Sequence, residues 1–102
     1  MKDRRVVITG LGAITPVGNT VDEMWESLLA GKSGIDFVTK VNKDLYPAKV
    51  AGEVKGFEPT DFIEKRDVRK MDPFTQYAVA ASKMAVKDAG LEINDENAHR
   101  VG

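Results

Sequence analysis

Apolar residues in the first third of the chain predict one strand followed by one helix. Val6, Val7 and Ile8 form a β-branched run between charged residues and glycines. This pattern is typical of a strand covered on both faces in a largely parallel or mixed sheet. From Val21 the apolar positions follow the spacing i, i+3, i+4, i+7 and i+8, so they share one helical face. The spacing predicts a helix over 21–29.

Polar residues and a glycine mark both ends of this helix. Thr20 is expected to cap the first turn, and Glu23 to reach back to the backbone of Thr20. Gly31 lacks a Cβ and is expected to end the helix. Trp25 belongs to the apolar face, which predicts that its ring lies in the core.

The middle of the chain predicts little regular structure. Glycines and prolines interrupt residues 32–60, and only 49–54 leaves room for an edge strand. Residues 60–64 predict a single helical turn, which 65–70 continue in a charged form.

A second long helix is predicted before the C-terminus. Asp72 is its expected cap, and Pro73 suits the first helical position, where a missing N–H does no harm. The helix should run to Ala89 and stop at Gly90. Its middle is apolar nearly all round, which predicts a central helix. After the polar connector 94–100 the chain stops where another strand is expected, so we interpret it as part of a larger core.

Composition narrows the classes of function. The 102 residues are 42% apolar and 30% charged, as in one small globular domain. With 15 basic and 16 acidic residues, no overall field favours nucleic acid or a membrane surface as a partner. The chain has no cysteine and one histidine, which excludes disulfides, thiolate metal sites and two-imidazole sites. No metal site is predicted. With no span or signal-peptide core, the chain is expected to be cytoplasmic.

The glycine-rich turn at 10–15 invites comparison with dinucleotide-binding turns, which also follow a strand. Thr15 stands where the third glycine of that fingerprint belongs, and Pro16 and Gly18 delay the helix. We therefore favour a tight turn in which the glycines let two backbones pack closely.

One local concentration of charge stands out. Residues 65–70 include four basic residues, and on a helix Arg66, Arg69 and Lys70 share a face. Such a run is either a solvated face or a docking surface for an acidic partner or a phosphate group. His99 lies in the polar connector and is expected to have a surface or capping role, not a catalytic one. No acid–base pair emerges from the sequence.

Four blocks in this order carry a family resemblance: RRVVITGLGAITPVGN at 4–19, LLAGKSGI at 28–35, AGEVKGFEP at 51–59 and RKMDPFTQYAVAASKMAVKDAGLEI at 69–93. With these blocks the chain resembles the N-terminal part of the β-ketoacyl-[acyl-carrier-protein] synthase II family, the elongating condensing enzymes of bacterial fatty acid synthesis. The likeness covers essentially the whole chain. Synthase I and modular polyketide synthases are less similar.

The resemblance implies an α/β fold of the thiolase type, with two pseudo-symmetric βαβαβ halves and usually a homodimer. Residues 1–102 would be the N-terminal part of the first half. The family catalyses a decarboxylating Claisen condensation, in which a cysteine carries the acyl group and two histidines assist malonyl-carrier. These residues and a supporting lysine lie beyond residue 102 in the family pattern, so no catalytic residue is expected here. No cofactor is expected beyond the phosphopantetheine arm of the acyl carrier protein.

The resemblance also implies a role for the basic run. The residues that meet the acidic recognition helix of acyl- and malonyl-loaded acyl carrier protein fall on Arg66, Arg69 and Lys70, with Lys65 beside them. Two hypotheses therefore stand. The chain is the N-terminal part of a condensing enzyme, or it is a complete short protein that acts as a carrier-binding or regulatory module.

Overall fold

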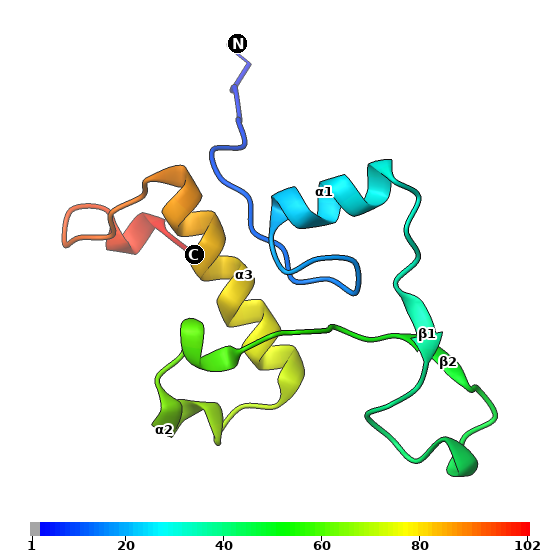
Figure 1. Cartoon of the computed structure of the whole chain (residues 1–102). Coiled ribbons are helices and arrows are strands. Elements are labelled where there is room, and N and C mark those ends of the chain that lie inside the picture. The colour runs from blue at the N-terminus through cyan, green and yellow to red at the C-terminus, as the bar shows by residue number, and fades with distance from the viewer. Residues whose placement is uncertain (1–2) are drawn as a thin grey trace.

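In the computed structural model, which describes residues 3–102, the long helix α3 runs through the middle of an open arrangement of short elements (Figure 1). The elements follow in the order α1 (Val21–Leu29), β1 (Ile35–Phe37), η1 (Lys43–Leu45), β2 (Val50–Gly52), η2 (Pro59–Asp61), α2 (Lys65–Val68), α3 (Pro73–Ala89) and η3 (Ala98–Arg100).

The elements cover one another only in part. The Cα radius of gyration is 17.4 Å, whereas about 13 Å is typical of a compact chain of this length. The accessible surface is 8558 Å² for a mass of 11.2 kDa, and roughly 5,700 Å² is expected for a compact protein of that mass. Among the described apolar residues, those classed as buried are Ile63 and Ala80.

Helix α1 forms where the apolar spacing predicts it. The Thr20 hydroxyl accepts a hydrogen bond from the N–H of Glu23 at 3.1 Å, which confirms the predicted cap. The Glu23 carboxylate, however, accepts from the N–H of Asn19 at 2.9 Å and not from that of Thr20. Gly31 follows the C-cap with a φ of +68°, a conformation that glycine adopts without strain.

The apolar face of α1 is not covered. The helix has no buried residue, and Trp25 is 57% exposed. The prediction that Trp25 lies in the core is therefore wrong for the described chain. A helical face with this spacing needs a second apolar surface against it, and residues 3–102 do not provide one there.

Strands β1 and β2 form an antiparallel hairpin to one side of α3 (Figure 1). Ile35 lies opposite Gly52, and Phe37 opposite Val50. Strand β2 lies within the predicted edge strand 49–54, while β1 has no counterpart in the sequence prediction.

The hairpin is closed and tethered by side chains. The Glu53 carboxylate accepts hydrogen bonds from the Thr39 hydroxyl at 2.8 Å and from the N–H of Lys40 at 3.0 Å. These bonds stabilise the ionised form, so the Thr39 hydroxyl first, and then the Lys40 N–H, lower the pKa of Glu53. The Lys40 ammonium donates to the Tyr77 hydroxyl at 2.9 Å and lies 5.6 Å from the ring centre, which joins the hairpin loop to α3.

The predicted strand at Val6, Val7 and Ile8 does not form. Val6 and Ile8 are 92% and 84% exposed, and no residue of this run is assigned to a strand. A strand exists through hydrogen bonds to a neighbouring strand, and no segment among the described residues pairs with this one. The strands present form a short antiparallel hairpin, where the sequence predicted a parallel or mixed sheet.

The glycine-rich turn packs closely against another backbone, as predicted, and the structure shows that this backbone is α3. A Cβ on Gly12 would lie 2.0 Å from the carbonyl oxygen of Ala81, and one on Gly10 would lie 2.3 Å from that of Ala85. Only glycine allows the backbones to approach this closely. The N–H of Leu11 adds a hydrogen bond of 3.0 Å to the Asp88 carboxylate.

Helix α3 has the predicted bounds. Pro73 occupies its first turn, and Gly90 ends it with a φ of +65°. The backbone of Asp72 is extended, as in a cap, but its side chain makes no capping hydrogen bond. The helix is central in position (Figure 1). Its cover is incomplete, because Ala80 is buried while Phe74 is 72% exposed.

Candidate functional site

The charged run folds as a corner between η2 and α3. Ile63, just before it, is 5% exposed and anchors the segment. Glu64 then adopts a ψ of 139°, which separates η2 from α2. The prediction that 65–70 continue the preceding helical turn is therefore wrong, because the extended Glu64 interrupts the helix. We call Lys65, Arg66, Arg69 and Lys70 the basic corner.

Aromatic contacts fix the residues before the basic corner against α3. Phe57 stacks on Phe62, with ring centres 6.0 Å apart and an interplanar angle of 13°. Phe57 also meets Tyr77 of α3 edge to face, at 5.2 Å and 75°. Such pairs contribute about 0.5–1.5 kcal/mol beyond the burial of their surface. The Lys83 ammonium of α3 donates to the Phe62 carbonyl, so η2 is fixed to α3 by rings and by a hydrogen bond.

A side-chain amide holds the other end of the corner. Gln76 of α3 donates to the carbonyl of Val68 at 3.3 Å and to that of Met71 at 3.1 Å. These carbonyls lie at the end of α2 and in the turn that follows. Since both ends of the segment are bonded to α3, the basic corner has a defined position on the long helix.

The turn after α2 keeps the predicted cations together. Helix α2 ends at Val68, but Arg69 remains in the right-handed helical region. The N–H of Lys70 then donates to the Asp67 carbonyl at 3.0 Å. All four cations of the basic corner are exposed, and residues 64–70 hold four basic and two acidic side chains, a formal charge of +2.

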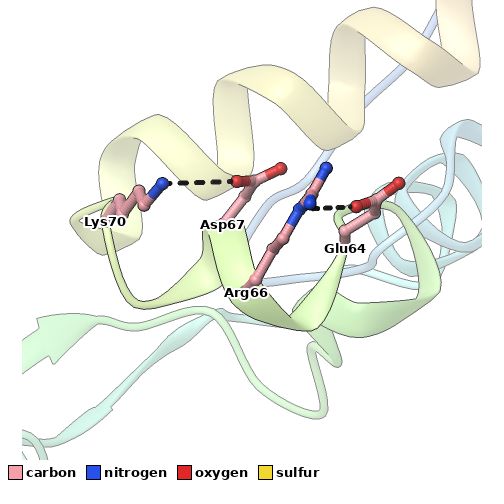
Figure 2. Close-up of polar contacts among 4 residues, drawn as sticks. All are labelled: Glu64, Arg66, Asp67 and Lys70. Atoms are coloured by element: carbon pink, nitrogen blue, oxygen red, sulfur yellow. Dashed lines mark ion pairs between the residues drawn. The ribbon is translucent and has the colours of Figure 1, made fainter.

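Two carboxylates within the segment pair with two of the cations (Figure 2). The Arg66 Nε lies 3.0 Å from a Glu64 oxygen, and the Lys70 Nζ lies 4.0 Å from an Asp67 oxygen. Among the described residues, neither of the other two cations of the corner forms an ion pair. Sequence reasoning missed these carboxylates, although the i,i+3 spacing of Asp67 and Lys70 was a readable signal.

A cleft of about 760 Å³ lies where the N-terminal segment, α1, η2 and α3 converge. Leu11, Phe62 and Met84 give it apolar walls, and Asp61 and Lys83 are among its charged lining residues.

No cluster of acidic, histidine or cysteine side chains suited to a metal ion occurs in residues 3–102. His99 is exposed, in line with its predicted surface role. In the same part of the chain, no helix has the length and apolar character needed to cross a bilayer.

Comparison with known proteins identifies the class. Residues 3–102 match the family described as Beta-ketoacyl synthase, N-terminal domain, and the chain belongs to this family. A solved structure titled the ishigamide ketosynthase/chain length factor superposes with a TM-score of 0.79 at 43% identity. The match covers 87% of this chain and 22% of that one. The fold is therefore that of the N-terminal ketosynthase domain, thiolase-like, as the sequence predicted.

Particular relatives narrow the class further. The chain is 50% identical over 101 residues to 3-oxoacyl-[acyl-carrier-protein] synthase 2 of Staphylococcus aureus (strain N315), covering 99% of this chain and 24% of the relative. It is 49% identical over 102 residues to the protein of the same name from Vibrio cholerae serotype O1, covering 100% of this chain and 25% of the relative. The predicted resemblance to synthase II is confirmed. The chain spans about a quarter of the length of these relatives.

Proposed function

We propose that these 102 residues serve as the N-terminal part of a β-ketoacyl-[acyl-carrier-protein] synthase of the synthase II type. That enzyme elongates an acyl chain held on a cysteine. Malonyl-carrier loses carbon dioxide, the new carbon–carbon bond forms, and the cysteine thiolate is released. The observation that carries the proposal is identity of about one half to 3-oxoacyl-[acyl-carrier-protein] synthase 2 across the whole chain. In the complete enzyme we expect a cytoplasmic homodimer.

The role of this part is scaffold and docking. The sequence contains no cysteine, so the acyl-carrying group must come from elsewhere in the enzyme. The basic corner offers four exposed cations with a net positive charge on a segment fixed to α3. Exposed ion pairs contribute about 0.2–1 kcal/mol each and weaken with salt. Such a surface suits fast, reversible contact with an acidic acyl carrier protein, which brings its own phosphopantetheine arm.

A second function is favoured by one feature of the fold. The contacts that hold the basic corner come from η2, the residues beside it and α3, all within this chain. A short protein of this sequence would therefore keep the surface needed to bind an acyl carrier protein. Its function would be that of a carrier-binding or regulatory module without catalysis.

The mass of the protein in its source cells separates these two functions. An antibody against residues 60–90 would capture it, and intact-mass spectrometry would weigh it. A species several times heavier than 11.2 kDa is expected for the condensing enzyme. A species at that mass would instead favour the carrier-binding module.

Charge reversal tests docking in the complete enzyme. The double variant Arg66→Glu, Arg69→Glu is expected to raise the KM for acyl-carrier substrate about tenfold, because two attractive charges become repulsive, while the KM for an acyl-CoA analogue stays unchanged. The matched control is Lys87→Glu, Arg100→Glu, which reverses two exposed charges outside the basic corner. Equal carrier KM values for the two double variants would contradict the docking assignment.

A further inference from the structure

The carboxylates of Glu64 and Asp67 compete with any acidic partner for two cations of the basic corner. We propose that Glu64 and Asp67 tune the docking of the acyl carrier protein by occupying Arg66 and Lys70 in the free protein. This inference rests on the proposed docking function and adds a regulatory device to it. A carrier carboxylate must displace an internal carboxylate to reach either cation.

The two pairs differ in strength and are both exchangeable. Arg66 and Glu64 meet at 3.0 Å, a charge-assisted hydrogen bond, while Lys70 and Asp67 meet at 4.0 Å. The side chains of Arg66 and Glu64 are 80% and 70% exposed, and those of Lys70 and Asp67 are 76% and 40% exposed. Pairs this exposed are screened by water and release their partners easily. Glu64 is therefore expected to have the larger effect on docking, and Asp67 the smaller.

The backbone of the corner does not depend on the two carboxylates. The Glu64 carbonyl accepts the N–H groups of Asp67 at 2.8 Å and Val68 at 3.2 Å, which is the backbone part of the helix cap. The Glu64 side chain makes no capping hydrogen bond. Replacement by the corresponding amides therefore removes charge while the fold of the corner is retained.

Removal of the two carboxylates changes the charge that an approaching carrier meets. Residues 64–70 carry a formal +2, and the double variant Glu64→Gln, Asp67→Asn raises this by two charges. All four cations then become available, in place of Lys65 and Arg69 alone. An acidic partner is attracted more strongly and from further away, and the effect falls as salt shortens the Debye length. The internal carboxylates therefore keep carrier binding weak enough for rapid release.

In the test, holo-acyl carrier protein from the source cells is titrated into the complete enzyme. The Kd is measured by calorimetry at low and high salt. At low salt, Glu64→Gln is expected to lower Kd by about twofold to fivefold, and the double variant by about tenfold. At high salt the difference should largely disappear. The carrier KM should fall in parallel, without a change for acyl-CoA analogues.

A matched control makes the same change of charge elsewhere. Glu92→Gln, Asp95→Asn removes two exposed carboxylates beyond the end of α3 that is remote from α2 (Figure 1), and its Kd should equal that of the wild type. Equal Kd values for the wild type and the Glu64, Asp67 double variant would overturn the tuning proposal. It would equally be overturned if the control tightened binding as much as the double variant. If the wild type failed to bind carrier at low salt, docking itself would be overturned as well.

Discussion

The basic corner and the N-terminal segment 4–12 both rest on α3, yet they complete their contacts in opposite ways. Ile63, just before the corner, is buried at 5% exposure, and the four cations of the corner are exposed. The N-terminal segment meets α3 mainly through glycine backbone and leaves Val6 92% exposed. The residue that anchors the corner is therefore covered within the chain, whereas the N-terminal segment presents apolar side chains and unpaired backbone groups that nothing in residues 3–102 covers.

The difference follows from the way in which helices and strands satisfy their backbone hydrogen bonds. Helices satisfy their backbone hydrogen bonds locally, while a strand depends on residues distant in sequence. The basic corner is built from a short helix, a turn and one face of α3, so its geometry needs few distant partners. The run Val6–Ile8 needs a neighbouring strand, and its β-branched residues alone do not create one.

The largest effect is expected on stability, when a buried side chain beside the corner and an exposed one in the N-terminal segment are each shortened. Ile63→Ala is expected to destabilise the corner by about 2–4 kcal/mol, because it removes a buried side chain and leaves a cavity. Val7→Ala, at a side chain that is 64% exposed, should change stability by less than about 0.5 kcal/mol. Denaturant unfolding of both variants measures the difference. Similar losses would mean that the N-terminal segment is covered as well as the corner is.

A smaller effect is expected where the N-terminal segment touches α3. Gly12→Ala places a Cβ 2.0 Å from a backbone carbonyl oxygen, and this overpacking should cost about 1–3 kcal/mol. Gly31→Ala is the control, because there a Cβ meets nothing within 4 Å and only its φ of +68° is strained. The readout is hydrogen exchange at the Leu11 N–H, which should accelerate in the first variant alone. Unchanged protection of Leu11 would contradict the close packing.

The cap of α1 should matter less again. Thr20→Ala removes the hydroxyl that accepts the Glu23 N–H, and the loss should be about 1 kcal/mol. Thr20→Ser keeps the hydroxyl and should behave nearly like the wild type. Urea unfolding followed by circular dichroism measures both. If serine and alanine were equally destabilising, the hydroxyl would not be the stabilising group.

The smallest effect concerns the hairpin, which is separate from both regions. The pKa of Glu53 is lowered in the folded chain by the Thr39 hydroxyl first and then by the Lys40 N–H. Its contribution to stability is therefore fully present above the ordinary glutamate pKa of about 4.3, and is lost as pH falls through the lowered value. Amide chemical shifts of Thr39 and Lys40 should follow this titration, and Glu53→Gln should abolish it. An unchanged titration in that variant would assign the effect to another group.

Local patterns in the sequence were enough to locate α1 and α3. In α1 the apolar spacing and Thr20 operate within a few residues of one another, and in α3 Pro73 and Gly90 do the same at either end. The sequence was also enough to identify the cations of the basic corner, since all four lie within residues 65–70. Their internal partners were harder to predict. Glu64 has an extended backbone just before α2 and pairs with Arg66 two residues on, whereas residues two apart within a helix do not face each other.

The sequence by itself determined the family, the two main helices, the tight glycine turn and the location of the basic residues, because each depends on residue identity or on contacts between near neighbours. Only the tertiary structure decided that Val6–Ile8 stays unpaired, that Trp25 is exposed and that Glu53 closes the hairpin. It also decided that Gln76 and Lys83 hold the corner on α3. Each of these outcomes depends on which distant segments are present to form a contact, and local sequence carries no record of that.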